Sequence, residues 1–275
     1  MTNNTVWFVT GGSKGLGLVL ARTLAERGAK VAVTTRTSET LELRGENVLG
    51  LEVNLLDEQS VKRAVQKTLE RFGRIDVVVN NAGYGQMGAV EEVSDAEARA
   101  NFDVNVFGVL NVLRAVLPSM RKQRSGHVFN IASIGGFVGG FPGWGIYCAT
   151  KFAVAALTEG LKEELSPFGI RSTVVYPGYF RTEFLARGSI ATPSAPIDGY
   201  DAVRATERAH TVDINHQQPG DPQKLAKVLI DVAAQPKPPL HLFLGSDAVK
   251  MAHQKLGTLQ QALAETDAVS RSTDF

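Results

Sequence analysis

The sequence is poor in cysteine, has almost no net charge, and lacks long hydrophobic runs. Its 275 residues include a single cysteine, Cys148, which excludes an internal disulfide and favours a reducing compartment. The 29 basic and 28 acidic residues give a net charge of +1 and form no block of one sign. Charge therefore provides no reason to expect nucleic acid or a membrane surface as a partner.

Neither a membrane span nor a leader peptide is expected. No uninterrupted apolar stretch reaches the ~18 residues that a membrane-spanning helix needs. The first residues, MTNNTVWFVTGG, lack a cationic region followed by a long apolar run. Metal-ligand spacing is absent among the five histidines, which are His127, His210, His216, His241 and His253. We expect a cytoplasmic protein without a catalytic metal.

Short segments rich in Val, Ile and Phe alternate with longer segments of helical periodicity. The predicted strands are Thr5–Thr10, Lys30–Thr35, Val48–Val53, Ile75–Val79, His127–Ala132, Arg171–Tyr176 and Leu240–Leu244. The predicted helices are Leu16–Arg27, Glu58–Arg71, Asp95–Leu117, Tyr147–Leu165, Pro222–Ala234 and Asp247–Ala264, followed by a polar and loose tail. The alternation predicts one domain over residues 1–275, with a doubly wound, Rossmann-type parallel sheet and helices on both faces. Its ligand crevice would lie beyond the carboxyl ends of the strands.

One region departs from this alternation. Residues 178–220, between the sixth predicted strand and the next helix, form a long connection with prolines at 193, 196 and 219. Long connections in compact domains are usually functional. We predict a lid or substrate-binding loop here, in preference to a second domain.

A glycine-rich turn, Thr10–Gly17, closes the first strand and opens the first helix with the spacing G-x-x-x-G-x-G. Glycines let the backbone turn sharply and approach a ligand closely. The helix N-terminus then offers unpaired N–H groups and a positive dipole end to a pyrophosphate. The turn alone would also suit any tight strand–helix connection, and its spacing differs from G-x-G-x-x-G.

Further motifs follow this turn in order along the chain. They are Asn80-Asn81-Ala82-Gly83, Asn105 within FDVNVFGVLN, Ser133 within NIAS, Tyr147 and Lys151 as Y-x-x-x-K, and Pro177-Gly178 with Thr182 as P-G-x-x-x-T. With these motifs the chain resembles, over essentially its whole length, the short-chain dehydrogenase/reductase family in its compact single-domain branch. The segment Leu240–Ala248 is similar to hydroxysteroid-dehydrogenase-like members of that family.

The resemblance implies a dinucleotide-dependent oxidoreductase with a small-molecule substrate, assembled as a homodimer or homotetramer through the helices 95–117 and 147–165. It implies a catalytic set of Asn105, Ser133, Tyr147 and Lys151, in which Asn105 anchors a water and Lys151 also holds the nicotinamide ribose. The predicted cofactor-binding residues are Gly11, Ser13, Lys14, Gly15, Leu16, Gly17, Arg36, Asn54, Leu55, Asn81, Ala82, Gly83, Tyr147, Lys151, Pro177, Gly178 and Thr182.

The spacing of Tyr147 and Lys151 explains how a phenol could work as an acid or base. Residues i and i+4 of a helix lie on one face, so the ammonium is expected near the phenol. A phenol with a pKa near 10 is a poor acid/base at neutral pH, and a nearby cation lowers that pKa. Ser133 would give the reacting oxygen a second hydrogen bond. Alone, each of these residue types is more often a turn, packing or surface residue, and Cys148 we interpret as a packing residue.

The end of the second strand favours NADP(H) over NAD(H). Folds that prefer NAD place a carboxylate there for the ribose 2′-hydroxyl, whereas this chain has Thr35 followed by Arg36. The Arg36 guanidinium suits a 2′-phosphate, and Lys14 adds a second cation, although both could be ordinary surface cations. Asn54 stands where the family usually has Asp, and its side-chain oxygen can accept a hydrogen bond from the adenine amino group.

Substrate contacts are predicted in the loops beside this site. The predicted residues are Gly85, Gln86, Ser133, Phe141, Trp144, Tyr147, Phe180 and Phe184. With Phe137, the aromatic residues of the loop 134–144 would form an apolar wall around a carbonyl compound. They would equally suit packing beneath the loop, or contact with a neighbouring subunit.

The leading hypothesis is an NADP(H)-dependent carbonyl reductase or alcohol dehydrogenase, with Tyr147 as general acid/base. A 3-oxoacyl-carrier-protein reductase is an alternative, but apart from Arg181 and Arg187 no basic patch for an acidic carrier is apparent. A non-catalytic NADP(H)-binding sensor is another, against which the complete catalytic set argues. A nucleotide-sugar epimerase or dehydratase usually has G-x-x-G-x-x-G and a larger substrate domain.

Overall fold

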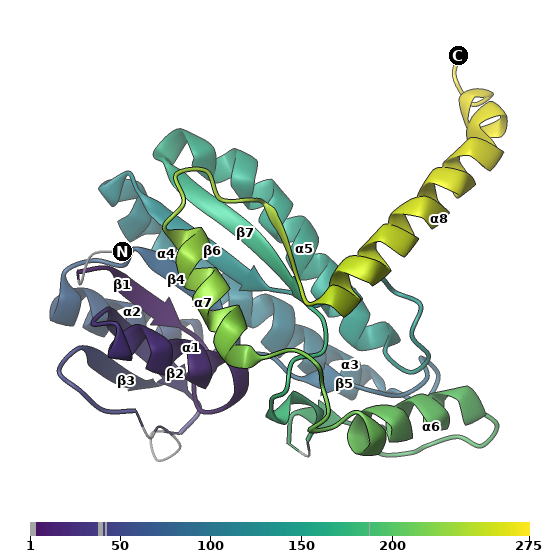
Figure 1. Ribbon diagram of the computed structural model, residues 1–275, viewed down its shortest axis with the longest axis horizontal. Helices are drawn as coiled ribbons and strands as arrows, with labels where there is room; N and C mark the ends of the chain where they lie inside the picture. Colours follow the sequence, from purple (N-terminus) through teal and green to yellow (C-terminus); the bar gives the residue numbers. More distant parts are fainter. Residues whose placement is uncertain (1–3, 38–40, 42, 187) are drawn as a thin grey trace.

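The computed structural model describes residues 4–37, 41, 43–186 and 188–275. Seven parallel strands form one sheet in the order β3-β2-β1-β4-β6-β7-β9 (Figure 1). They are β1 (Val6–Val9), β2 (Lys30–Thr35), β3 (Val48–Glu52), β4 (Val77–Asn80), β6 (Gly126–Ile131), β7 (Ile170–Pro177) and β9 (His241–Leu244). The predicted doubly wound α/β sheet is thereby confirmed, and the predicted strands coincide with these to within a residue or two.

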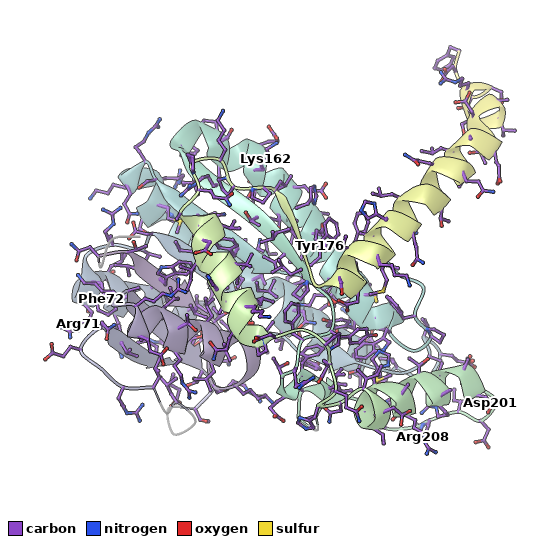
Figure 2. The ribbon with its side chains drawn as sticks, viewed as in Figure 1. Arg71, Phe72, Lys162, Tyr176, Asp201 and Arg208 are labelled. Carbon is purple, nitrogen blue, oxygen red and sulfur yellow. The ribbon has the colours of Figure 1, made fainter. Side chains whose placement is uncertain are left out.

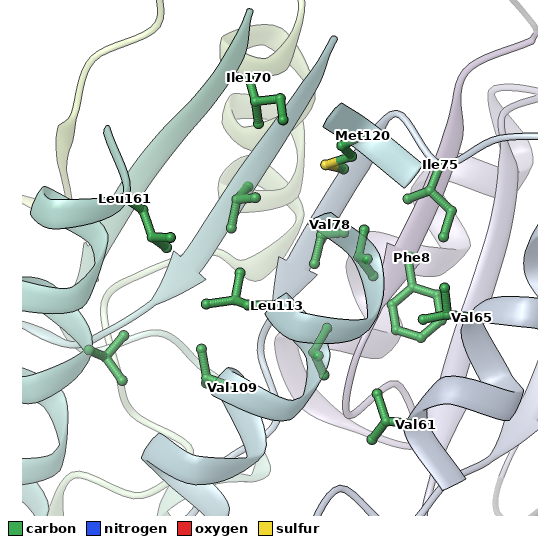
Figure 3. Packing of buried hydrophobic residues seen from close by; sticks show 14 of the residues in the cluster. Phe8, Val61, Val65, Ile75, Val78, Val109, Leu113, Met120, Leu161 and Ile170 are labelled. Carbon is green, nitrogen blue, oxygen red and sulfur yellow. The ribbon is translucent and has the colours of Figure 1, made fainter. Parts of the chain in front are cut away.

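Helices cover both faces of the sheet. On one face lie α1 (Gly15–Glu26) and α7 (Pro222–Ala233), and on the other α2 (Glu58–Phe72), α4 (Gly108–Gln123) and α5 (Gly145–Leu165). The remaining helices are α3 (Asp95–Phe102), which leads into α4, and α6 (Asp201–Arg208) and α8 (Ser246–Arg271), which lie away from the two faces (Figure 1). Because successive strand residues point to opposite faces, Phe8 belongs to the core under α2, α4 and α5, while Trp7 and Val9 belong to the core under α1 and α7. Figure 3 shows the first of these cores, where Phe8 lies beside Val61 and Val65 of α2.

The helix that begins at Asp95 is longer than predicted. Helix α3, a π-helical turn (Asp103–Phe107) and α4 follow one another without a break to Gln123, with Pro118 inside α4. By length and composition this helix could cross a membrane, but half of its apolar window is buried. Burial of Val109, Val112 and Val116 against the sheet accounts for its apolar face.

The C-terminal prediction was wrong in one respect. Instead of a loose tail after Ala264, α8 continues to Arg271. Arg271 donates to the Asp267 carboxylate at 2.9 Å, an i,i+4 pair of the kind that supports an exposed helix. After Ala252 the helix has no buried residue, and it projects away from the body of the molecule (Figure 1).

The connection 178–220 lies over the carboxyl end of the sheet. It holds the short strand β8 (Ile190–Ala191), which pairs in parallel with β5 (Gly85–Gln86), then α6 and a π-helical turn (Ala209–Asp213). Figure 2 places Asp201 and Arg208 of α6 at the edge of the molecule, away from Tyr176 inside the sheet. The segment thus covers the place where the crevice was predicted.

Candidate active site

The glycine turn is held closely against the turn that follows β4. Gly11 (φ +70°) and Gly15 (φ +59°) adopt left-handed backbone conformations that disfavour other residues. A Cβ on Gly11 would lie 2.8 Å from the Cα of Ala82, and one on Gly17 would lie 2.3 Å from the Gly11 carbonyl oxygen. These glycines are needed so that two turns and a helix N-terminus can meet.

Asn81 locks the two turns together. Its Nδ2 donates to the carbonyls of Thr10 (3.0 Å) and Gly11 (3.1 Å). In return, the Thr10 hydroxyl accepts from the backbone N–H groups of Asn81 and Ala82 at 3.0 and 3.1 Å. The turn is therefore formed before any ligand arrives, as a rigid floor for a phosphate-bearing group.

A cavity of about 600 Å³ opens above this floor. Most of the predicted cofactor residues line it, namely Gly11, Ser13, Lys14, Gly15, Leu16, Arg36, Asn54, Leu55, Asn81, Ala82, Gly83, Tyr147, Lys151, Pro177, Gly178 and Thr182. So do the predicted substrate residues Ser133, Phe141, Trp144, Phe180 and Phe184. Gly17, Gly85, Gln86 and Asn105 lie outside the cavity wall.

Tyr147 and Lys151 lie one turn apart on α5, and both are buried. The Lys151 ammonium is 5.8 Å from the centre of the Tyr147 ring, and it donates to the Ile131 carbonyl at 2.9 Å. Ser133, which follows β6, hydrogen-bonds Tyr147, and its Oγ also accepts from the Gly135 N–H at 3.1 Å. The three residues therefore meet at one point of the cavity.

Burial changes the protonation of this group in a direction that the sequence did not predict. It raises the pKa of Tyr147 above its ordinary value, and the hydrogen bond with Ser133 offsets only part of that rise. Burial also lowers the pKa of Lys151 to about 8. The expectation that Lys151 lowers the phenol pKa is thus reversed here, because desolvation dominates. The phenol is held in its protonated form.

Asn105 lies in the π-helical turn and holds the backbone of the turn after β4 in place. Its Oδ1 accepts from the Tyr84 N–H, and its Nδ2 donates to the Tyr84 carbonyl and the Thr150 hydroxyl, each at 3.0 Å. A Cβ on Gly83 would lie 2.9 Å from the Asn105 Oδ1 and 3.5 Å from the Lys151 ammonium. Asn105 therefore shapes the turn beneath Lys151, and its role as a water anchor stays a prediction.

The far end of the cavity fits the adenosine half of a dinucleotide. Arg36, Asn54 and Leu55 line the cavity, and Glu183, in the connection 178–220, is the one carboxylate among its described lining residues. The Asn54 Oδ1 accepts from the Leu56 N–H at 3.0 Å, so one of its two lone pairs remains for adenine. Lys14 donates to the Gly188 carbonyl of the connection 178–220 at 3.3 Å, which places its ammonium between the glycine turn and that connection.

The opposite end is aromatic. The Trp144 and Phe184 rings lie 5.2 and 5.8 Å from the Tyr147 ring. Phe137 instead packs against Tyr176 and Phe243, away from the cavity. Gly85 lies under Trp144, since its Cβ would be 2.8 Å from that ring, and Gln86 is buried and bonds the Met87 carbonyl.

Sequence reasoning missed three polar residues of this wall, Tyr179, His210 and Gln218. All three lie in the connection 178–220, and no motif marks the positions of His210 and Gln218. Cys148 is buried beside Tyr147, and burial raises the pKa of its thiol to about 11, which makes it a poor nucleophile. In the part of the chain that the structure describes, no three His, Cys, Asp or Glu side chains gather as a metal site would require.

Comparison with known proteins agrees with this geometry. The family model for short chain dehydrogenases matches residues 5–190. Oxidoreductase BOA17 of Botryotinia fuckeliana is 36% identical over 270 residues, which cover 95% of each chain. A 3-ketodihydrosphingosine reductase of Bacteroides thetaiotaomicron is 36% identical over 86% of each chain. A short-chain dehydrogenase from Streptomyces avermitilis superimposes with a TM-score of 0.89 at 37% identity, covering 98% of this chain and 100% of that one.

Related structures contain either dinucleotide. One from Burkholderia cenocepacia in complex with NADP has a TM-score of 0.71 at 29% identity, and it covers 96% of this chain and 98% of that chain. One from Burkholderia phymatum in complex with NAD has a TM-score of 0.78 at 25% identity, and the coverage is 94% and 97%. The neighbours therefore agree on a nicotinamide dinucleotide and differ in which one is bound.

Proposed function

The chain belongs to the short-chain dehydrogenase/reductase family and is an oxidoreductase of CH–OH and C=O groups, and from this premise we propose an NADP(H)-dependent ketone reductase or alcohol dehydrogenase in which Tyr147 is the general acid/base. The observation that carries the proposal is the meeting of Tyr147, Ser133 and Lys151 between the glycine-floored and the aromatic ends of one cavity. When bound, the nicotinamide would supply or accept the hydride.

In the reductive direction, the chain's own residues would manage the proton. The protonated Tyr147 phenol would donate to the substrate oxygen while the Ser133 hydroxyl hydrogen-bonds the same atom. The phenolate left behind would be stabilised by the Lys151 ammonium one turn away. Because burial keeps the phenol protonated, the site suits the acid role, and reduction is the direction we propose.

Arg36 and Lys14 support NADP(H) as the preferred cofactor. Both line the cavity, and Arg36 directly follows the strand end where NAD-preferring folds have a carboxylate. A guanidinium can bind a phosphate with two parallel hydrogen bonds. We also propose a cytoplasmic homodimer or homotetramer; the buried, unpaired Cys148 is compatible with that compartment.

A neutral ketone is favoured over a carrier-bound acyl thioester. Among the described residues that line the cavity the cations are Lys14, Arg36 and Lys151, and none is part of the aromatic end. Arg181 donates to the Gln218 carbonyl at 3.1 Å, and Arg187 lies outside the described residues. Among the described residues, no cation at that end supports binding of an acidic carrier.

The test is NADPH oxidation across a panel of ketones and one 3-oxoacyl thioester. We expect Tyr147→Phe to keep cofactor binding, measured by NADPH fluorescence, and to lose turnover by about 10²-fold or more. Tyr176→Phe, which removes another buried hydroxyl from the sheet, is the matched control and should stay active. A fully active Tyr147→Phe protein would refute the mechanism, and NADPH binding without turnover of any ketone would favour the sensor.

A further inference from the structure

A second polar patch lines the aromatic end of the cavity and takes no part in the proposed proton transfer. It consists of Tyr179, which follows β7, His210 in the π-helical turn, and Gln218 near the end of the lid. His210 is 8% exposed and Gln218 is 1% exposed. Polar groups buried to this extent normally have hydrogen-bond partners, so their partners show what the patch can still bind.

The hydrogen bonds of His210 fix its tautomer. Its Nδ1 lies 2.8 Å from the Thr206 carbonyl, which can only accept, so Nδ1 carries the hydrogen. Burial lowers the pKa of His210, which keeps the ring neutral. The bare Nε2 must then accept from the Tyr179 hydroxyl at 2.8 Å. The only hydrogen of the Tyr179 hydroxyl is donated in this bond, so its oxygen can only accept a further hydrogen bond.

Gln218 is also left as an acceptor. Its Nε2 faces the Thr182 carbonyl at 3.5 Å, which assigns the amide nitrogen to that side. The Oε1 is buried and has no partner among the described residues. A buried acceptor without a donor is costly, and Gln218 is one of the residues that line the cavity.

We infer that the ketone substrate also carries a hydroxyl or amino group, which donates a hydrogen bond to the Gln218 Oε1 and the Tyr179 oxygen. This inference rests on the proposed function and adds the substrate class. A ligand group that only accepts, such as a second carbonyl or a carboxylate, would leave the buried Gln218 Oε1 without a donor. The substrate is therefore a hydroxy ketone or an amino ketone.

Trp144 lies next to both the reacting residue and the patch. Its ring lies 5.2 Å from the Tyr147 ring and 5.1 Å from the His210 ring, edge-on to both. A substrate that reaches both Tyr147 and the patch would therefore have an apolar part against the Trp144 indole, between its ketone and its hydroxyl or amino group.

The experiment compares ketones that differ only at the far end, which bears a hydroxyl, an amino or a methyl group. We expect the wild-type protein to have a higher kcat/KM for the hydroxyl or the amino ketone than for the methyl ketone. Gln218→Met keeps the length of the side chain and removes the acceptor, so this preference should fall about tenfold, the loss of one hydrogen bond to a buried acceptor. Gln217→Met, at the exposed neighbouring glutamine, is the matched control.

Turnover of the methyl ketone tests the proposed function separately from the preference. An unchanged preference in Gln218→Met, or no preference in the unvaried protein, would overturn the inference. Should Gln218→Met fail to fold, Tyr179→Phe removes the other acceptor. Should no ketone react, calorimetric binding of the same three compounds to the NADP⁺-loaded protein gives the same comparison, and equal affinities would reject it.

A different observation carries a second inference, on the projecting part of α8. Leu256, Leu259 and Leu263 are 47%, 44% and 70% exposed, and with Val249 and Ala252 they repeat at alternating steps of three and four. This is the a/d pattern of a coiled-coil seam, which is narrower than the stripe of a core-facing helix. The face is therefore suited to one other helix.

The charges along α8 identify that helix as another α8. Near its base Lys250 and Lys255 outnumber Asp247, and near its tip Glu265 and Asp267 outnumber Arg271. An antiparallel pair sets the basic part of one helix beside the acidic part of the other, and also opposes their dipoles favourably. Since Lys255, Glu265, Asp267 and Arg271 leave the projecting part without net charge, attraction to an anionic lipid surface is not expected. We propose that two copies pair through this seam about a two-fold axis.

The test is the mass of the full chain in light scattering. We expect Leu259→Lys with Leu263→Lys to halve the mass, whereas Gln261→Lys, on the opposite face of α8, leaves it unchanged. For the antiparallel order, His253→Cys and Asp267→Cys should cross-link when mixed and fail to do so alone. A mass unaffected by the two lysines would overturn the pairing, as would cross-linking of each cysteine variant with itself.

Discussion

Two single residues carry the proposed preference for NADP(H) and the proposed stabilisation of the Tyr147 phenolate. Arg36 carries the proposed choice of cofactor, because it is the cation next to the strand end where a carboxylate would select NAD. Lys151 carries the proposed stabilisation of the phenolate, and burial lowers its pKa to about 8, so that this contribution should depend on pH. Each role leads to its own measurement.

Arg36→Ala should lower kcat/KM with NADPH by about 10- to 100-fold, the effect of losing a charged two-pronged hydrogen bond to phosphate. With NADH, which lacks the 2′-phosphate, the change should be small. Arg22→Ala, on the exposed face of α1, is the control. Equal losses with both cofactors would show that Arg36 does not bind the 2′-phosphate.

The reduction rate should fall as the pH rises through about 8. Burial lowers the pKa of Lys151 to about 8 from 10.5, so its ammonium is charged below that pH and neutral above it. Loss of the charge removes the group that stabilises the phenolate. The measurement is kcat/KM for ketone reduction between pH 6 and 10 with Lys151→Met as comparison, and a flat profile for the unvaried protein would contradict the role.

Among the elements, the connection 178–220 is held in place by two carboxylates, Glu92 before α3 and Glu97 in its first turn. The buried Glu92 accepts from the Ala89 and Ile197 N–H groups and from Arg204 on α6, at 2.7, 2.8 and 2.5 Å. Glu97 caps α3 through Ser94 and accepts from the Ser194 N–H at 2.9 Å. These contacts keep the lid against the cavity although little regular structure connects it to the sheet.

Acid should release this part of the lid. Hydrogen bonds from Ser94 and Ser194 lower the pKa of Glu97 to about 2 from 4.5. A carboxyl with a lowered pKa stabilises the folded state above pH 4.5, and that contribution is lost as the pH falls towards 2. Pepsin should therefore cut within residues 192–204 at pH 2 and far less at pH 4. The Glu97→Gln variant should be cut readily at both pH values. Identical digestion of the wild-type protein and the variant at pH 4 would show that Glu97 does not hold this segment in place.

At the level of the whole molecule, cofactor binding should stabilise the folded state. The cavity is walled by the turns after β1, β4, β6 and β7 and by the lid, so a bound dinucleotide contacts segments from across the chain. A ligand at 100 times its Kd stabilises the folded state by about 2.7 kcal/mol. For a protein of this size, NADPH at that concentration should raise Tm by roughly 5 °C or more. A calorimetric scan with and without NADPH measures it, and an unchanged Tm would argue against the site.

The sequence by itself determined the sheet and the place of the site. Apolar runs with period two or 3.6 state which residues each strand and helix buries, and the glycines at 11 and 15 occupy backbone conformations that few other residues tolerate. Local patterns of this kind can be recognised in the amino-acid sequence without knowledge of the fold. They predicted the doubly wound parallel sheet, and the motifs that resemble the short-chain dehydrogenase/reductase family predicted Ser133, Tyr147 and Lys151, which line one cavity.

Only the tertiary structure decided that Tyr147 stays protonated and that Asn105 and Phe137 lie away from the cavity wall. It also decided which lid residues form the polar patch, namely Tyr179, His210 and Gln218. A pKa depends on how much water the surrounding chain removes, and burial here outweighs the neighbouring cation. The lid residues come from segments without periodicity, whose positions follow from long-range contacts such as those of Glu92. Contacts between residues distant in sequence leave no local pattern, and so they had to be seen in the folded chain.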